Sequence, residues 1–138
     1  YVRNATMDLF QHKQLRLMID LKDDQGLPTR TIGSIDLFEI DSLHQRAGVG
    51  ILIHQKEDRN HGYAHQALNV MIRYAFRVLF LHQLFCHIDC DNQASIKLFK
   101  NNGFEITGTK KHWIKTQQGW KDELILQLIN ADDHSNQS

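Results

Sequence analysis

The sequence predicts a mixed α/β domain of the α+β class, with strands in its first half and two helices before a final hairpin. Hydrophobic residues alternate along residues 14–22, and the period changes to three and four residues after Gly62. The 138 residues carry 16 Lys+Arg against 16 Asp+Glu and are 41% hydrophobic, as is typical of one globular domain. We expect that domain over residues 1–130, followed by a polar tail at 131–138.

The first half reads as three consecutive strands. Leu15, Leu17, Ile19 and Leu21 alternate within residues 14–22, and the turn-forming residues 23–26 follow. Residues 31–40 form the hairpin partner, and residues 45–54 form a third strand. Strands joined by short turns predict an antiparallel meander.

The second half alternates helices with strands. Residues at three- and four-residue steps after Gly62 predict a helix of about five turns; they are Ala67, Leu68, Met71, Tyr74, Ala75 and Val78. Residues 84–89 form a strand, and residues 92–102 form a helix that Asp91 or Asn92 caps and that Gly103 ends. Strand–helix–strand order predicts a parallel crossover. Residues 104–115 and 121–129 form the last hairpin.

Composition argues against several classes of function. A formal net charge of zero and a pI near 7.3 do not suit a broad nucleic-acid-binding surface, which needs excess Lys and Arg. No apolar run approaches the ~18 residues of a membrane span, and the first residues do not resemble a signal peptide. We therefore expect a cytoplasmic protein without nucleic-acid or membrane partners.

The junction at residues 57–64 joins a strand to the long helix and is a candidate phosphate site. A helix start exposes unpaired N–H groups at the positive end of its dipole, so it attracts anions. Gly62 and Ala64 leave room for a close approach, and Arg59 adds a charged donor. The same residues also suit an ordinary turn.

Residues 92–104 form the second notable segment. Asn92 caps the helix, Leu98 and Phe99 pack inward, and Gly103 ends it. Each residue alone has a structural explanation.

Together, about thirty residues apart and in this order, the two segments resemble the GNAT superfamily of acyl-CoA-dependent N-acetyltransferases. Arg59 to Ala64 matches the family signature Gln/Arg-x-x-Gly-x-Gly/Ala, and the helical signature is matched by Asn92, Ser95, Leu98, Phe99, Gly103 and Phe104. The resemblance implies a mostly antiparallel central sheet, flanked by helices and splayed at its fourth and fifth strands. It also implies that the chain is N-terminally truncated, with the first strand and much of the first helical pair missing.

Residues 33–40, with His44 and residues 51–53, look most like spermidine and spermine acetyltransferases and ribosomal-protein acetyltransferases. That resemblance runs from about Arg16 to Leu128. It implies transfer of an acetyl group from acetyl-CoA, the cosubstrate, to a primary amine, with a polyamine as the leading acceptor. A protein N-terminus is the alternative acceptor, and a non-catalytic CoA-binding module is a third reading. Relatives often form dimers, so a homo-oligomer is also open.

The resemblance implies that two backbone segments and one helix-capping residue bind the cofactor. Backbone groups of Leu52, Ile53 and His54 would run beside the pantetheine arm, with one N–H facing the thioester oxygen. The pyrophosphate would lie at the helix start, and Asn92 would contact the cofactor from the second helix. The residues expected at the helix start are Arg59, Asn60, His61, Gly62, Tyr63 and Ala64.

The sequence leaves several candidates for the groups that accept and donate protons in the reaction. Asp36 and Glu39 are the expected catalytic acids, because a polycationic acceptor needs fixed negative charge, and His44 and His54 are alternative bases. The two acids have opposite parity along the strand and share a face only across a bulge. Phe99 stands where many relatives have a proton-donating Tyr.

Because Phe99 cannot donate a proton, three possibilities stay open. Another donor such as Tyr63, Tyr74 or a water protonates the leaving thiolate, the thiolate leaves without a donor, or the protein has lost activity. His61 and His65 have a spacing that could serve a metal, but they coincide with the phosphate turn, so we expect no metal site.

Overall fold

The computed structural model describes residues 2–4 and 13–132. Its elements follow the predicted order with one additional strand at the start. They are β1 (Val2–Asn4), β2 (Leu15–Lys22), β3 (Pro28–Asp41), β4 (Arg46–Ile53), the short 3₁₀ helix η1 (Lys56–Asp58), α2 (Tyr63–Arg77), β5 (Gln83–Asp89), α3 (Gln93–Asn101), β6 (Glu105–Thr116) and β7 (Gly119–Ile129).

One seven-stranded sheet runs through the protein in the order β1-β2-β3-β4-β5-β7-β6. The predicted meander is confirmed, because β2, β3 and β4 pair antiparallel. The predicted crossover is confirmed as well, since β5 lies parallel to β4. The first strand was expected to be missing, but a short strand precedes β2: β1 is three residues long and pairs antiparallel with Ile19 to Leu17 at the edge of the sheet.

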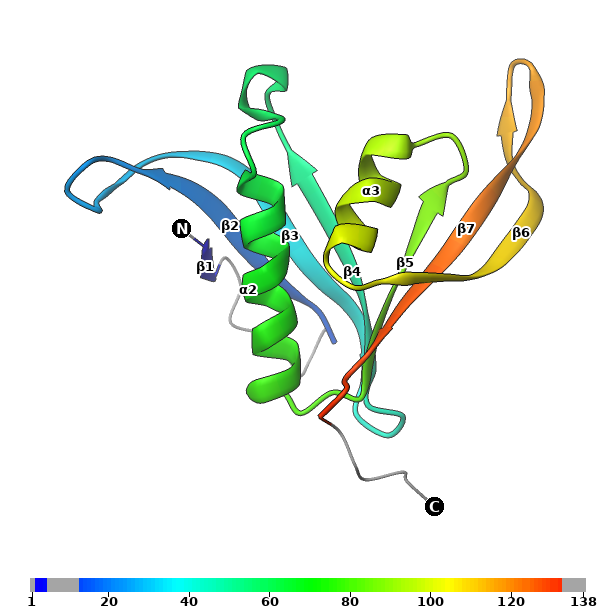
Figure 1. Cartoon of the computed structure of the whole chain (residues 1–138), viewed down its shortest axis with the longest axis horizontal. Helices are drawn as coiled ribbons and strands as arrows, with labels where there is room; N and C mark the ends of the chain where they lie inside the picture. The colour runs from blue at the N-terminus through cyan, green and yellow to red at the C-terminus, as the bar shows by residue number, and fades with distance from the viewer. Residues whose placement is uncertain (1, 5–12, 133–138) are drawn as a thin grey trace.

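Both long helices cover the same face of the sheet, α2 over β2 to β4 and α3 over β5 (Figure 1). Between them and the sheet lies one hydrophobic cluster, in which Ile35, Leu37, Leu68, Met71 and Leu84 are fully buried. Burial of such side chains contributes roughly 1.5–3 kcal/mol each and is the main favourable term in folding.

The helix ends are close to those predicted. α2 begins after Gly62 and ends at Arg77, so it has about four turns rather than five. Asn92 caps α3, since its side chain accepts a hydrogen bond from the Ser95 N–H at 3.2 Å. Gly103 adopts the left-handed conformation expected after the helix, with φ of 94°.

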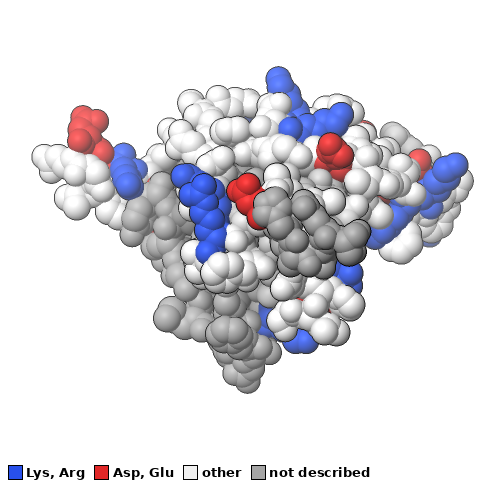
Figure 2. Space-filling view, turned by 60° about the horizontal axis from the view of Figure 1, so that its bottom comes forward, with Lys and Arg blue, Asp and Glu red and all other residues white. Residues whose placement is uncertain are grey.

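On the end of the molecule where α2 finishes, the Lys, Arg, Asp and Glu side chains of the described residues are spread over separate groups (Figure 2). Within residues 2–4 and 13–132, no helix is long and apolar enough to cross a membrane. Most of the polar tail expected at 131–138 lies outside the described residues.

Truncating a core side chain of α2 tests the packing of this helix. We expect Leu68→Ala to lower the free energy of unfolding by about 2–5 kcal/mol, because Leu68 is fully buried. Val70→Ala is the matched control, since Val70 is 39% exposed on the same helix. Urea unfolding at 25 °C measures both, and equal losses would contradict the assigned packing.

Candidate active site

The loop between β4 and α2 ends in a turn that exposes free backbone N–H groups. Asn60 and Gly62 are both left-handed, with φ of 65° and 79°. The first helical bond runs from the Gln66 N–H to the Gly62 carbonyl at 3.0 Å, so the N–H groups of residues 63–65 have no acceptor within the helix. No acidic side chain lies in the first turn. The turn therefore offers an electropositive cradle of the kind that binds phosphate.

The backbone at Gly62 is open to an incoming group. A Cβ built on this residue would meet no atom within 4 Å, and its positive φ disfavours any residue with a side chain. Arg59 lies next to the turn and reaches back along β4, where its Nη2 lies 3.5 Å from the Ile53 carbonyl oxygen. The turn thus combines free N–H groups with a nearby guanidinium.

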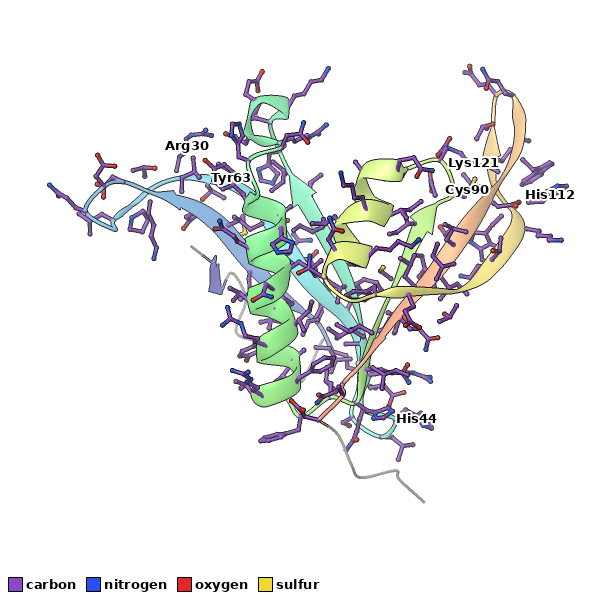
Figure 3. The ribbon with its side chains drawn as sticks, in the orientation of Figure 1. Arg30, His44, Tyr63, Cys90, His112 and Lys121 are labelled. Atoms are coloured by element: carbon purple, nitrogen blue, oxygen red, sulfur yellow. The ribbon has the colours of Figure 1, made fainter. Side chains whose placement is uncertain are left out.

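An ion pair between the exposed Arg30 and the buried Asp58 anchors this loop to the sheet. Asp58, 7% exposed at its side chain, accepts two hydrogen bonds from the guanidinium of Arg30 on β3, one of 2.9 Å. These bonds lower the pKa of the Asp58 carboxyl below its ordinary value. Figure 3 shows Arg30 close to Tyr63 at the start of α2. The pair fixes the chain one residue before Arg59, so it positions the turn that follows.

β4 and β5 part after three residue pairs. Arg46–Gly48 pairs with Gln83–Phe85, after which β4 continues along β3 to Ile53 and β5 continues along β7 to Asp89. The strands diverge toward the end where α2 and α3 begin (Figure 1). The splay implied by the GNAT resemblance is present, and it opens toward the turn at the start of α2.

Hydrogen-bond alternation decides which β4 backbone groups face the gap. The His54 N–H donates to the Ile32 carbonyl at 2.8 Å, so His54 and Leu52 direct their backbone groups toward β3. The N–H and C=O groups of Ile53 and Ile51 therefore point into the gap. Of the three residues expected along the pantetheine arm, Ile53 has this orientation, and Ile51 was not among them.

Asn92 lies at the N-terminus of α3, close to the open end of the gap (Figure 1). Its side-chain oxygen is used for capping, but its amide NH₂ donates no bond within the described residues. The side chain can therefore still donate to a ligand while it holds the helix end.

The two expected acids sit differently on β3. Asp36 pairs across the sheet with Gly50, one strand away from the gap, and both its oxygens accept bonds from Arg16, at 2.8 and 3.0 Å. Glu39 lies in the register shift between Phe38 and Asp41, with φ of 49°. An irregularity of the kind that their parity demands therefore lies at Glu39, which flanks the closed, paired part of β4.

The alternative proton-handling groups are scattered. His44 is in the β3–β4 turn at the opposite end of the molecule from Tyr63 (Figure 3). His54 is exposed beyond the last residue of β4. Phe99 is 3% exposed and packs edge-to-face on Phe104 at 5.0 Å, so it is a core residue. Tyr63 stacks on His61 in the turn before α2.

A row of rings where the gap closes was not identified from the sequence. Phe38 packs edge-on against Phe85 at 5.9 Å, and Phe85 contacts His87 at 5.6 Å. Gly48 makes the row possible, because a Cβ there would collide with the Phe38 ring. Alternation along β5 was the available signal: Leu84, Cys86 and Ile88 are buried, so Phe85 and His87 face the other side.

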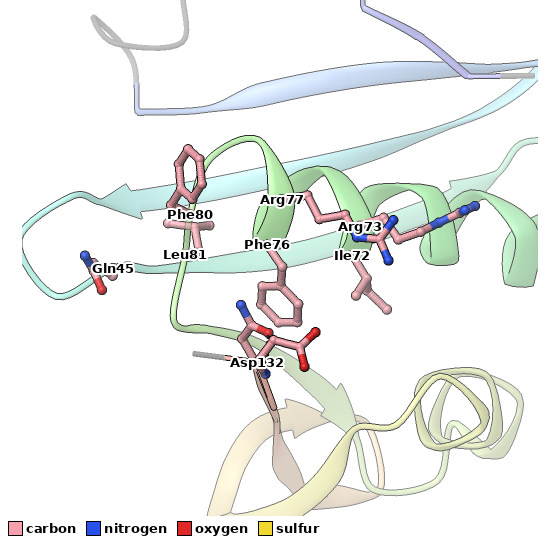
Figure 4. A pocket seen from close by; sticks show the side chains of 9 residues that line it. Gln45, Ile72, Arg73, Phe76, Arg77, Phe80, Leu81 and Asp132 are labelled. Carbon is pink, nitrogen blue, oxygen red and sulfur yellow. Dashed lines mark hydrogen bonds between the residues drawn. The ribbon is translucent and has the colours of Figure 1, made fainter. Parts of the chain in front are cut away.

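A separate hollow lies away from these features. It has a volume of about 470 Å³ between the end of α2 and the end of β7, and Phe76, Arg77, Phe80 and Asp132 line it (Figure 4). Among the described residues, no group of three or more His, Cys, Asp or Glu could hold a metal ion. His61 and His65 have other contacts, with the Glu57 carbonyl and the Asn102 amide, each at 3.0 Å.

Comparison with known families identifies the domain. The family model described as "Acetyltransferase (GNAT) domain" matches residues 2–105, about three quarters of the chain. The chain belongs to the GNAT family.

Curated relatives are similar over part of their length. The chain is 29% identical over 105 residues to the probable N-acetyltransferase YjcK of Bacillus subtilis (strain 168), covering 75% of this chain and 58% of that protein. It is 32% identical over 80 residues to the spermidine N(1)-acetyltransferase of Escherichia coli (strain K12), covering 58% of this chain and 42% of that protein. The chain thus spans about half the length of the curated relatives it matches.

Solved structures support the GNAT fold. The spermidine N-acetyltransferase of Vibrio cholerae, in a complex with CoA and spermine, superimposes with a TM-score of 0.74 at 23% identity, covering 88% of this chain and 68% of that one. Its F149A mutant gives a TM-score of 0.75. At this level of identity the likeness concerns the fold.

The Arg30–Asp58 pair predicts a pH-dependent stability. The pKa of Asp58 is lowered, so its contribution is present at neutral pH and is lost as the pH falls through that lowered pKa. We expect Asp58→Asn to lower the Tm by several degrees at pH 7, with the difference from wild type shrinking as the pH falls below the ordinary pKa of an Asp carboxyl. Thermal unfolding monitored by circular dichroism across pH measures this. The exposed Asp24→Asn is the control, and a difference independent of pH would contradict the ion-pair explanation.

Proposed function

We propose that the protein transfers the acetyl group of acetyl-CoA to a primary amine, with a polyamine such as spermidine or spermine as the leading acceptor. One observation carries the proposal: the gap between β4 and β5 opens onto a helix start whose N–H groups are free. Family membership supports acetyl transfer. The names of the relatives from Escherichia coli and Vibrio cholerae support a polyamine acceptor.

The α2 turn fits the pyrophosphate of CoA. Backbone N–H groups from His61 to His65 would donate to phosphate oxygens, and the positive end of the helix dipole adds to the attraction. Arg59 supplies a charge-assisted donor beside them. Asn92 would contact the cofactor from α3 through its free amide.

The unpaired edge of β4 fits the pantetheine arm, which carries amide groups of its own. The backbone groups of Ile51 and the N–H of Ile53 point into the gap and can pair with those amides as a neighbouring strand would, while Arg59 approaches the Ile53 carbonyl. One of these N–H groups would also stabilise the negative charge that develops on the thioester oxygen. The acyl donor supplies a carbonyl activated by its thioester bond.

The amine side needs negative charge and a proton acceptor. An alkylammonium group titrates near ~10.4, so at neutral pH it must lose a proton before it attacks. Asp36 and Glu39 would contribute fixed charge on β3 that attracts a polycation. Because Arg16 occupies both oxygens of Asp36, that carboxylate suits electrostatic attraction better than proton transfer.

A CoA-binding module without catalysis is the second candidate, and the buried Phe99 favours it. The side chain at this position packs in the core and has no proton to give. Such a module would bind CoA and release no thiol.

Release of CoA thiol from acetyl-CoA separates these functions. We expect turnover with spermidine or spermine, in a panel that also holds small amines and a basic N-terminal peptide. Turnover with the peptide alone would favour an N-terminal acetyltransferase. Thermal stabilisation by acetyl-CoA without turnover would favour the binding module. The absence of both turnover and thermal stabilisation would contradict the proposed function.

Replacing the turn glycine tests the phosphate site. We expect Gly62→Val to weaken CoA binding at least tenfold, because the side chain would fill the approach to the free N–H groups. Isothermal titration with CoA measures the affinity. Gly26→Val is the matched control, since Gly26 also has a positive φ of 81° and open surroundings, but in the β2–β3 turn. Equal CoA affinity in the two variants would remove the phosphate assignment.

A further inference from the structure

The face of the sheet opposite the helices carries a row of aromatic rings where the gap between β4 and β5 closes. Gly48 and Phe85 are the last paired residues of β4 and β5. On this face, the rings of Phe38 and Phe85 meet edge-on and Phe85 contacts His87, so a row of rings crosses from β3 to β5. His87 lies two residues beyond the last pair, on the part of β5 that has left β4.

Glu123 on β7 holds one side of this imidazole. Its Oε1 lies 3.9 Å from Nδ1 of His87, which is longer than a hydrogen bond. Lys110 on β6 approaches the same oxygen at 3.7 Å. Nε2 of His87 bonds to nothing in the described part of the chain, and the side chain is 31% exposed. The imidazole thus lies beside a carboxylate on its Nδ1 side, and its Nε2 side has no bonding partner among the described residues.

The position of His87 matches the place where an acceptor amine has to arrive. With phosphate at the start of α2, an arm lying between the strands brings its thioester toward the closed end of the gap. The helices fill one face there, so the acceptor approaches from the face that carries the rings. Phe38 and Phe85 offer apolar surface to an alkyl chain and aromatic faces to its ammonium group.

We infer that His87 is the proton acceptor for the attacking amine and that Glu123 is its positioning residue. The inference rests on the proposed acetyl transfer. Nε2 of the neutral imidazole takes one proton from the ammonium group, and the freed electron pair forms the bond from nitrogen to the acetyl carbon. The bond from carbon to sulfur breaks, and its electron pair leaves with the sulfur. The second nitrogen proton goes to the sulfur, and the first passes from His87 to solvent.

The other candidate bases lack this placement. Arg16 holds Asp36, Glu39 lies beside the paired part of β4, and His44 is in a remote turn. Of the charged groups that face His87, Glu123 comes from β7 and Lys110 from β6. Lys110 also lies 4.6 Å from the ring of Trp113, which keeps its charge on the β6 side.

The experiment compares His87→Gln with His112→Gln, an exposed histidine at the outer edge of β6 (Figure 3). Steady-state thiol release with spermidine and isothermal titration with CoA are measured for each. We expect His87→Gln to lower kcat roughly a hundredfold, as loss of a general base does, with CoA affinity within twofold of wild type. His112→Gln should match wild type in both.

The pH profile separates proton transfer from a structural role. Wild-type kcat/KM should show an acidic limb that is absent in His87→Gln. The variant should approach the wild-type rate near pH 10, where an alkylammonium begins to lose its proton unaided. Glu123→Gln should lower kcat about tenfold, and the double variant should be no slower than His87→Gln alone.

Each outcome decides the matter. Turnover by wild type with kcat of His87→Gln within twofold overturns the inference and leaves the proposed function standing. A lower kcat of His87→Gln that persists unchanged at high pH, or that comes with lost CoA affinity, assigns His87 a structural role. That result also overturns the inference. A wild-type protein that turns over no amine overturns the proposed function, and the inference falls with it.

Discussion

β4 and β5 share only three residue pairs, because β3 holds β4 as far as Ile53 while β7 holds β5 as far as Asp89. Beyond these pairs, backbone groups along both strands face the gap. Unpaired N–H and C=O groups in a dry interior would cost a few kcal/mol each, so the gap must be filled by water or by a ligand with its own hydrogen-bonding groups. The pantetheine arm is such a ligand. The site therefore depends on the missing pairing between the ends of β4 and β5, which results from their pairing with β3 and β7.

Ion pairs hold the outer ends of this gap. On the β4 side, Asp58 binds Arg30 and fixes the loop before the phosphate turn. On the β5 side, Lys121 of β7 binds Asp89 and Asp91, and both carboxylates raise its pKa. Exposed pairs of this kind contribute little to stability, but they restrict where a strand end lies. Asp58 differs because it is buried, so its charge requires the partner.

How much the sequence could predict depends on the range of the interaction. Local patterns were sufficient for the meander, both long helices, the Asn92 cap and the Gly103 stop, because neighbouring residues determine them. The Arg30–Asp58 pair joins residues 28 apart, and no local pattern reports it. Whether Ile53 or Leu52 directs its backbone groups into the gap depends on the pairing of β4 with β3. The hydrogen bond from the His54 N–H shows that pairing. The row from Phe38 to His87 needs three strands in register at once.

The replacement of the family Tyr by Phe99 is best weighed through the two protons of the reaction. A thiol titrates near ~8.5, so a CoA thiolate can leave at neutral pH with little help, and loss of a donor there costs little. An alkylammonium titrates at about 10.4, so only about one amine in 2,500 is free at pH 7, and loss of an acceptor costs far more. A chain can therefore exchange its donor for a core phenylalanine and still be an enzyme, provided that an acceptor remains on the amine side. Whether catalysis survives in this protein thus depends on the face that carries His87, and the packing of Phe99 alone does not decide it.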